Sequence, residues 1–575
     1  MLMVLRFLRP FRAPIAGVLA LALAQSLANL YLPRLMADIV DHGIVAGDTS
    51  RIFEIGGLML VVAVLGTGCA VGASYFASRV AIGVGRAVRD ELFARVARFS
   101  VHQFDRFSTA SLVTRTTNDT TQVQQVLLML LTMAVTAPMM AIGGVLLSLS
   151  QDAGLARVLI AVIPVLGLVF LAIMWAAVPL FQQMQAKIDR LNLVLDEGLS
   201  GVRVIRAFDR GAHESRRFAA ANEDVTATAI RVNRLVAVLM PSMFLTMNLT
   251  SVTILWLGAT RIDGGTMQVG AMMASLQYAI QILFAVFMVT AVFVTLPRAA
   301  AAASRISEVL EVVPEVTDPA SPRDVAVVTG RVEFQDVTFQ YPGAEEPALS
   351  GVSFTAEPGE VTAIVGGTGA GKSTLAGLIP RFCDVNHGRV LVDGVDVREW
   401  RQEALRAGIG YVPQKTVLFS GTIASNIRFG HEAASDDDLR RAARVAQASE
   451  FIDAMPEGYE APVAQGGTNL SGGQKQRLAI ARALVRQAAI YVFDDSFSAL
   501  DFATDARLRA ALRAETTAAT VFVVSQRIGT VMGADRIIVL DEGRVAGIGR
   551  HAELMRTCEV YREIAESQAS REDVA

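Results

Sequence analysis

The sequence predicts a membrane domain of six long α-helices followed by an α/β domain with a phosphate-binding loop. Three observations support this prediction. The first half of the 575-residue chain holds six apolar windows without Asp, Glu, Lys or Arg. The second half alternates strand-like and helix-like segments, and a glycine-rich loop at 366–374 joins a strand to a helix. The expected boundaries are 1–300 for the membrane domain, 301–328 for a linker, 329–566 for the α/β domain and 567–575 for a polar tail.

The composition supports membrane burial and excludes several other classes. Apolar residues make up 52% of the chain and charged residues 19%, with a mean hydropathy of +0.43. Such apolar content excludes general disorder. Three cysteines without a CxxC pair exclude a disulfide scaffold. A net charge of −3 and an isoelectric point near 6.2 give no reason to expect a nucleic-acid partner.

Each apolar window meets or nearly meets the length of about 20 residues that a helix needs to cross roughly 30 Å of hydrocarbon. The alternative, a large soluble helical core, rarely contains such unbroken windows. We therefore expect a lipid bilayer around the first half of the chain. The windows are 15–33, 55–78, 126–150, 158–179, 235–260 and 267–297.

Arginine placement predicts the orientation in the membrane. Arg6, Arg9 and Arg12 precede the first window, and the long segments after the second and fourth windows are rich in arginine. The positive-inside rule then places both termini and both long segments in the cytoplasm. The start resembles a signal peptide with a cleavage site near Ala24, but apolar character continues through Leu35 and five more windows follow, so we do not expect cleavage.

The two long segments, 79–125 and 182–233, lack strong helix breakers. We expect the membrane helices to continue through them into the cytoplasm and to reverse near 104–111 and 207–212. The tips of these extensions could then touch a cytoplasmic domain.

The phosphate-binding loop fits the pattern G-x-x-x-x-G-K-[ST] between a strand at 360–365 and a helix at 375–379. Glycines allow backbone N–H groups to wrap phosphates, and the helix N-terminus adds positive potential. Lys372 would reach the β- and γ-phosphates, and the Ser373 hydroxyl would bind Mg²⁺. The full loop is Gly366, Gly367, Thr368, Gly369, Ala370, Gly371, Lys372, Ser373 and Thr374.

Two further motifs complete the pattern. The strand at 489–493 ends in Asp494, a carboxylate suited to hold Mg²⁺ opposite Ser373. A glycine-rich turn opens the helix at 475–484 and is either a helix-capping turn or a second phosphate clamp. This turn is Leu470, Ser471, Gly472, Gly473 and Gln474.

In this order, the motifs resemble those of ATP-binding cassette (ABC) exporters, in the form of half-transporters with six membrane helices fused to one P-loop ATPase domain. The resemblance covers essentially the whole chain, and Leu470–Gln474 matches the family signature. It implies ATP and Mg²⁺ as ligands, with each ATP held between the phosphate loop of one subunit and the signature of the other. By the same resemblance Tyr341 stacks on adenine, Gln414 touches Mg²⁺, the loop ending at Asp501 crosses the dimer interface and residues 197–209 form the second coupling loop.

Two positions depart from the family pattern. Asp495 stands where the family has a glutamate that polarises water, and Gln526 stands where it has a histidine that contacts the γ-phosphate. A displacement of about 1 Å in a positioned group can lower a rate about 10²-fold. Either substitution alone could be neutral drift. Both, however, affect the hydrolysis step, while the residues expected to bind ATP are retained. The pattern resembles the degenerate-site subunit of heterodimeric bacterial exporters, whose partner supplies the glutamate and histidine.

A smaller departure precedes the signature, where Val463-Ala464-Gln465-Gly466-Gly467 stands and the family's Gly-Glu is missing, so the chain lacks a carboxylate that the resemblance implies for one contact between cassette and membrane loops. The windows themselves carry no ionisable side chain, which disfavours a proton relay, and their methionines would suit hydrophobic or amphipathic cargo. We therefore expect a subunit of an exporter or flippase in the bacterial inner membrane. Two alternatives stay open: a slow homodimeric transporter, and an ATP-gated channel or regulator.

Overall fold

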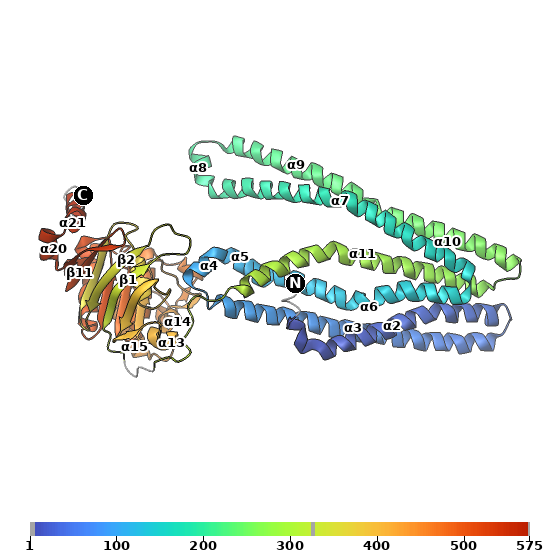
Figure 1. The fold of residues 1–575 in the computed structure, drawn as a ribbon, viewed down its shortest axis with the longest axis horizontal. Coiled ribbons are helices and arrows are strands. Elements are labelled where there is room, and N and C mark those ends of the chain that lie inside the picture. Colours follow the sequence, from blue (N-terminus) through green and yellow to red (C-terminus); the bar gives the residue numbers. More distant parts are fainter. Residues whose placement is uncertain (1–5, 324–327, 573–575) are drawn as a thin grey trace. The chain divides into compact units, whose positions relative to one another are not determined.

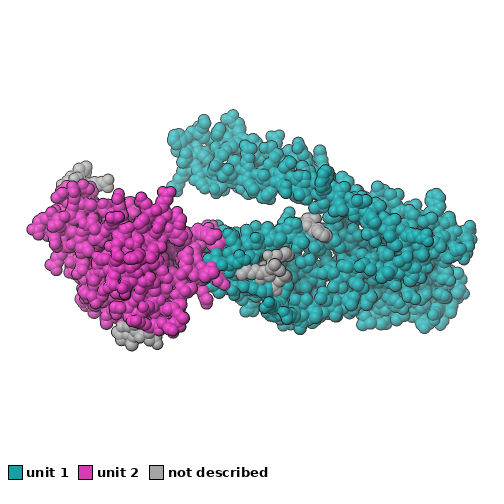
Figure 2. Space-filling model, in the orientation of Figure 1, with its two compact units in different colours: residues 1–94, 110–312 teal, residues 95–109, 313–575 magenta. Residues whose placement is uncertain are grey.

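The computed structural model describes residues 6–323 and 328–572, and its helices and strands are drawn in Figure 1. It divides into two compact units, which Figure 2 shows in different colours. Unit 1 comprises Met1–Ala94 and Ala110–Val312, and unit 2 comprises Arg95–Thr109 and Val313–Ala575. This division differs from the expected boundaries in two respects. Unit 1 continues to Val312, whereas the membrane domain was expected to end at residue 300. A short stretch from the first half of the chain belongs to the second unit.

Six helices in the described part of the chain are long and apolar enough to cross a membrane, as the sequence predicted. Five of the six apolar windows fall within these helices, and the sixth begins at residue 267, just before the last helix starts. The helices run over Arg6–Ile44, Thr49–Val96, Thr109–Gln151, Ala153–Ser200, Gly211–Asp263 and Val269–Glu311.

Several of these helices are interrupted by short irregular segments. The first contains η1 (Arg6–Phe11), α2 (Arg12–Ile39) and the π-helical segment η2 (Val40–Ile44). The second is α3 (Thr49–Val96), and the third contains α5 (Thr109–Thr114), the π-helical η3 (Arg115–Asp119) and α6 (Thr120–Gln151). The others are α7 (Ala153–Ser200), the pair α9 (Gly211–Ala237) and α10 (Leu239–Asp263), and α11 (Val269–Glu311).

Polar contacts fix the packing of unit 1 at a few points. The Tyr278 hydroxyl donates to the Leu30 carbonyl at 3.1 Å and joins α11 to α2. Arg305 of α11 forms a bidentate pair with the buried Asp119, at 2.8 and 2.6 Å. Figure 1 shows α7 running beside α9 and α10. Apolar side chains such as Trp175, 85% exposed, and Trp256, 72% exposed, remain outside the packed core, as expected of a surface that faces lipid.

Both long segments, 79–125 and 182–233, are largely helical and reverse through short helices. The first reversal, α4 (Val101–Phe107), begins somewhat earlier than predicted and belongs to unit 2. There the Ser100 hydroxyl hydrogen-bonds the Glu315 carboxylate at 2.6 Å, and the Gln103 amide donates to the Val313 carbonyl at 2.7 Å. The first tip therefore contacts the segment that leads into the α/β domain. The second reversal, α8 (Val202–Ala207), lies in unit 1.

Unit 2 is an α/β domain with three sheets. A four-stranded antiparallel sheet has the order β2-β1-β4-β5, a six-stranded sheet has the order β12-β11-β3-β10-β9-β6, and β7 pairs with β8. The strands are β1 (Val332–Phe339), β2 (Leu349–Ala356), β3 (Val361–Gly366), β4 (His387–Val392), β5 (Val395–Asp396), β6 (Ile409–Val412), β7 (Gly421–Thr422), β8 (Pro462–Val463), β9 (Ile490–Asp494), β10 (Thr520–Val524), β11 (Arg536–Asp541) and β12 (Arg544–Gly549).

Helices surround these sheets. They are α12 (Lys372–Leu378), α13 (Gln402–Ala407), α14 (Ile423–Arg428), α15 (Asp436–Val445), α16 (Ser449–Asp453), α17 (Gly472–Leu484), α18 (Phe502–Glu515), α19 (Ile528–Val531), α20 (His551–Thr557) and α21 (Glu559–Glu572), with short 3-10 turns at Gly458–Glu460 and Gln465–Gly467. The last helix extends through 567–572, which was expected to be a polar tail; residues 573–575 of that tail, and residues 324–327 of the expected linker, lie outside the described residues.

The parallel part of the six-stranded sheet determines where the site lies. β3, β10, β9 and β6 are parallel neighbours, so their carboxyl ends share one edge. Ligands of such sheets bind beyond the carboxyl ends of the strands. The loops after Gly366, Val412, Asp494 and Val524 all begin there, and these are the loops that carry most of the predicted site residues.

Candidate functional site

The phosphate-binding loop has the predicted strand–loop–helix context, from β3 into α12. Gly369 and Gly371 adopt φ values of +85° and +91°, a region that side chains disfavour. A Cβ atom on Gly371 would lie 2.5 Å from the Ala348 carbonyl oxygen. These two constraints explain why the loop requires glycine at this position.

The side chain of Lys372 reaches back to the start of the phosphate-binding loop. Its ammonium group donates to the carbonyls of Gly366 and Gly367, at 2.9 and 2.5 Å. Burial lowers the pKa of Lys372, and the nearby carboxylates of Asp495 and Asp494 oppose this shift. An anion that brought oxygen atoms to this ammonium would supply further acceptors and favour its charged form.

Asp494, at the end of β9, is almost fully buried and receives two hydroxyl hydrogen bonds. Ser373 donates to it at 3.0 Å, and Tyr411 of β6 also hydrogen-bonds to it. Burial raises the pKa of Asp494, while the Ser373 and Tyr411 hydroxyls and the Lys372 charge act in the opposite direction. Tyr411 is a site residue that the sequence analysis missed.

One cavity of about 300 Å³ collects most of the predicted site residues. The phosphate loop, the β9 end and the segment after β10 all line it, together with Tyr341, whose hydroxyl lies 3.0 Å from that of Thr374. Gly366, Gly367 and Ala370 shape the loop without lining the cavity. The predicted residues that line it are Tyr341, Thr368, Gly369, Gly371, Lys372, Ser373, Thr374, Gln414, Asp494, Asp495 and Gln526.

The donors in this cavity fit Mg²⁺ bound together with phosphates. Ser373, Gln414 and Asp494 offer a hydroxyl, an amide and a carboxylate oxygen, the hard donors that Mg²⁺ prefers. Among the described residues, no group of three or more His, Cys, Asp and Glu side chains forms a complete metal cage. Mg²⁺ commonly uses one or two carboxylates plus substrate phosphates, so this donor set suits a Mg–nucleotide complex.

The Tyr411→Phe variant tests the contact with Asp494. We expect Mg²⁺-dependent ATP binding to weaken about tenfold, because a hydrogen bond to a charged group contributes roughly 1.5–3 kcal/mol. The Tyr411 hydroxyl lowers the pKa of Asp494, so its removal should raise that pKa further. The acid limb of ATP binding, measured by calorimetry across a pH series, should therefore move to higher pH.

Tyr459→Phe is the matched control, because Tyr459 is also partly buried and hydrogen-bonds Ser449 away from the cavity. It should leave the pH profile of ATP binding unchanged. Equal profiles for Tyr411→Phe and the wild-type chain would contradict the assigned contact.

Asp495 is held in an unusual backbone conformation. Its φ is +47°, and its N–H donates to the Val524 carbonyl at 3.0 Å. Burial raises the pKa of Asp495; a hydrogen bond from the Gln414 side chain and the charges of Arg527 and Lys372 oppose this shift. The Asp495 carboxylate is therefore engaged with Gln414 at the edge of the cavity.

The signature turn and Asp501 do not join this cavity within the chain. Ser471 caps α17 by a reciprocal pair of hydrogen bonds with Gln474, at 3.3 and 2.9 Å, while Leu470 is buried beneath the turn. Asp501 caps α18 by accepting from the Thr504 N–H at 2.9 Å, and this bond lowers its pKa. Both turns carry ordinary helix caps, and their polar groups lie apart from the phosphate loop.

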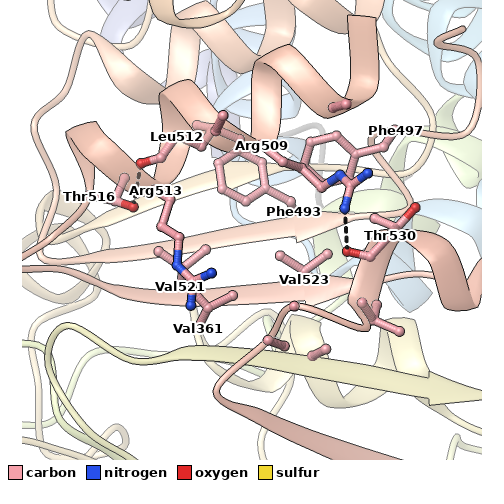
Figure 3. A pocket seen from close by; sticks show the side chains of 16 residues that line it. Val361, Phe493, Phe497, Arg509, Leu512, Arg513, Thr516, Val521, Val523 and Thr530 are labelled. Atoms are coloured by element: carbon pink, nitrogen blue, oxygen red, sulfur yellow. Dashed lines mark hydrogen bonds between the residues drawn. The ribbon is translucent and has the colours of Figure 1, made fainter. Parts of the chain in front are cut away.

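A second cavity, of about 380 Å³, lies between α18 and the sheet (Figure 3). Its lining is mainly apolar and comes from β3, β9 and β10, including Phe493 and Val523, and from α18 and the residues around α19. Arg509 donates to the carbonyls of Gly529 and Thr530, and Arg513 pairs with Asp535. None of the predicted nucleotide contacts lines this cavity, so it is distinct from the phosphate site.

Comparison with protein-family models matches both halves of the chain. Residues 15–286 match the model described as the ABC transporter transmembrane region, and residues 349–498 match the model described as ABC transporter. The first match covers most of the membrane helices, and the second extends from β2 to the segment that follows Asp495.

Comparison with known proteins finds similarity along the full length. The chain is 45% identical to an uncharacterized ABC transporter ATP-binding protein of Mycobacterium tuberculosis, covering 98% of this chain and 97% of that protein. It is 34% identical to the ATP-dependent lipid A-core flippase of Aromatoleum aromaticum, covering 87% and 82%. A solved structure of a bacterial Atm1-family ABC exporter with ATP bound matches with a TM-score of 0.79 at 27% identity, over 98% of each chain.

Proposed function

Since this chain belongs to the ABC transporter family, as an exporter-type half-transporter with its ATPase coupled to transport, we propose that it forms a heterodimer and carries the weakly hydrolytic ATP site of that assembly. The observation that supports this proposal is the composition of the 300 Å³ cavity. Asp495 and Gln526 line it together with Lys372, Ser373 and Asp494. The side chains expected to bind ATP and Mg²⁺ are retained. The two departures from the family pattern, Asp495 and Gln526, stand at the positions expected to serve hydrolysis.

The chemistry of these residues explains the proposed asymmetry. Mg²⁺, when bound with ATP, supplies charge neutralisation between the phosphates. Lys372 would hold the phosphates, while Ser373 and Asp494 would position the Mg²⁺ ligands. The shorter Asp495 carboxylate is already engaged with Gln414, and Gln526 can donate a hydrogen bond but cannot carry the charge of a protonated histidine. Neither residue is well suited to activate water.

The proposed partner is a second half-transporter with glutamate and histidine at the corresponding positions. The signature turn Leu470–Gln474 of this chain would complete that partner's ATP site. In unit 1, Phe208 next to α8 is 74% exposed and Val204 is 60% exposed, which offers an apolar surface for another subunit.

We propose that the cargo is hydrophobic or amphipathic and that the ATPase domain faces the cytoplasm of a bacterial inner membrane. The uncharged spans and the basic long segments support this assignment. Relatives support it as well, since one is named a lipid A-core flippase and another, 33% identical, a fatty acid ABC transporter of Mycobacterium bovis.

Native mass spectrometry of the tagged chain, purified from its own host in mild detergent, tests the proposal. We expect a complex of this chain with one similar-sized, different subunit whose sequence holds the missing glutamate and histidine. A mass of twice this chain would instead indicate a homodimer with two weak sites and would contradict the proposal. Ion current through that purified homodimer would favour an ATP-gated channel.

A further inference from the structure

The loop after β10 carries Gln526, which faces the nucleotide cavity, and the last helix of the chain contacts the backbone of this loop. The Gln568 side chain of α21 donates its amide N–H to the Gln526 carbonyl at 2.6 Å. Its amide oxygen accepts from the Ile528 N–H at 2.8 Å. One side-chain amide therefore satisfies two backbone groups that lie two residues apart, on either side of Arg527.

The position of Gln568 is itself determined by packing. Tyr561, Ile564 and Ala565 precede it at helical spacing and join a hydrophobic cluster with Ile528 and Val531. Tyr561 is fully buried, and its hydroxyl lies 2.8 Å from a ring nitrogen of His551. This apolar face holds α21 against α19 and directs Gln568 to the loop.

The opposite side of the loop is also anchored. The Arg527 guanidinium donates to the Ser498 carbonyl at 2.9 Å, and the Ser525 hydroxyl accepts from the Arg527 N–H at 3.0 Å. Beyond the loop, Arg509 holds the Gly529 and Thr530 carbonyls from α18, the second of which is drawn in Figure 3. Gln568 adds a side-chain contact to this loop from α21, the last helix of the chain.

We propose that Gln568 is a positioning residue of the nucleotide site: it clamps the backbone at Gln526 and Ile528, so that the Gln526 side chain stays directed at the terminal phosphate. Exposed loops lose such an orientation easily, because an unconstrained residue samples several backbone conformations. The C-terminal helix thereby contributes to the preference of this site for ATP over ADP. The nucleotide part of this inference rests on the proposed function, whereas the clamp itself does not.

The full-length chain, purified in its native complex and placed in lipid nanodiscs, allows both parts to be measured. Hydrogen exchange over residues 525–530 reports the clamp. Competition of ATP and ADP against a photoactivatable ATP analogue, quantified on this chain alone, reports the nucleotide preference. Gln568→Ala should accelerate exchange of the Ile528 amide about tenfold and reduce the ATP-over-ADP preference by a similar factor, because two hydrogen bonds are lost.

Two variants separate positioning from general stability. Gln568→Glu keeps the length of the side chain and the acceptor for the Ile528 N–H, but it replaces the donor to the Gln526 carbonyl by a second oxygen. It should therefore lose the ATP preference as Gln568→Ala does, while exchange of the Ile528 amide stays slower than in Gln568→Ala. Ser567→Ala is the control, because the Ser567 hydroxyl donates to the Ile564 carbonyl of its own helix. It should change neither measurement.

The outcomes are distinct. Unchanged exchange in Gln568→Ala would overturn the clamp. Faster exchange with an unchanged ATP-over-ADP preference would overturn the positioning role of Gln568. Weak labelling of this chain by the ATP analogue in the wild-type complex, with the clamp intact by exchange, would instead count against the proposed nucleotide site.

Discussion

Replacing Asp495 with Asn is expected to leave the ATP turnover of the heterodimer within about twofold of wild type, whereas the equivalent change of the partner's glutamate should lower it by at least about 10²-fold. The physical reason lies in the geometry of Asp495. Its carboxylate is one methylene shorter than glutamate, and it accepts a hydrogen bond from Gln414. Removal of its charge therefore removes little water activation. Phosphate release from the purified complex in nanodiscs measures both effects.

The reverse change provides the control for this asymmetry. Asp495→Glu combined with Gln526→His restores both family residues in a cavity that retains Lys372, Ser373 and Asp494. We expect this double variant to hydrolyse ATP at its own site when the partner's glutamate is removed. Loss of nearly all turnover in the Asp495→Asn complex would show that the site is hydrolytic, and the degenerate assignment would then be wrong.

The sequence predicted the membrane spans and the phosphate-binding strands because both depend on local patterns. Uncharged windows of about 20 residues mark membrane helices, and the strands predicted at 360–365 and 489–493 differ by one residue at each end from β3 and β9 in the structure. The helices α3 and α7 continue well beyond the apolar windows, as the lack of strong breakers in 79–125 and 182–233 indicated. Local pattern and tertiary structure agree in these elements.

The contacts between distant segments could not be predicted in this way. Gln568 lies 42 residues beyond Gln526, and no periodic pattern connects a helix side chain with a loop carbonyl. The same holds for Ser100 and Glu315, which are 215 residues apart and draw part of the first long segment into unit 2. Tyr411 could have been predicted as a site residue, because it lies near the carboxyl end of β6, a parallel neighbour of the strand that ends at Asp494.

The Ser471→Ala variant is expected to lower the ATP turnover of the heterodimer by at least about 10²-fold, although Ser471 lies outside the cavity of its own chain. In the proposed assembly this turn clamps the phosphates of the partner's competent site. Ser471 also caps α17, so its removal should cost about 1 kcal/mol of stability. Steady-state turnover and the thermal midpoint, measured on the same preparation, distinguish the two roles.

Ser435→Ala is the matched control for this change. Ser435 caps α15 through the same reciprocal arrangement, accepting from the Asp438 N–H at 3.2 Å, and it is exposed like Ser471. It should lower the thermal midpoint to a similar extent while leaving turnover near wild type. Equal turnover in Ser471→Ala and Ser435→Ala would mean that the signature turn acts only as a helix cap. Ser471→Thr keeps a hydroxyl that can cap α17, so its thermal midpoint should return to the wild-type value. Turnover that stays low in this variant would then report the loss of the phosphate contact across the dimer.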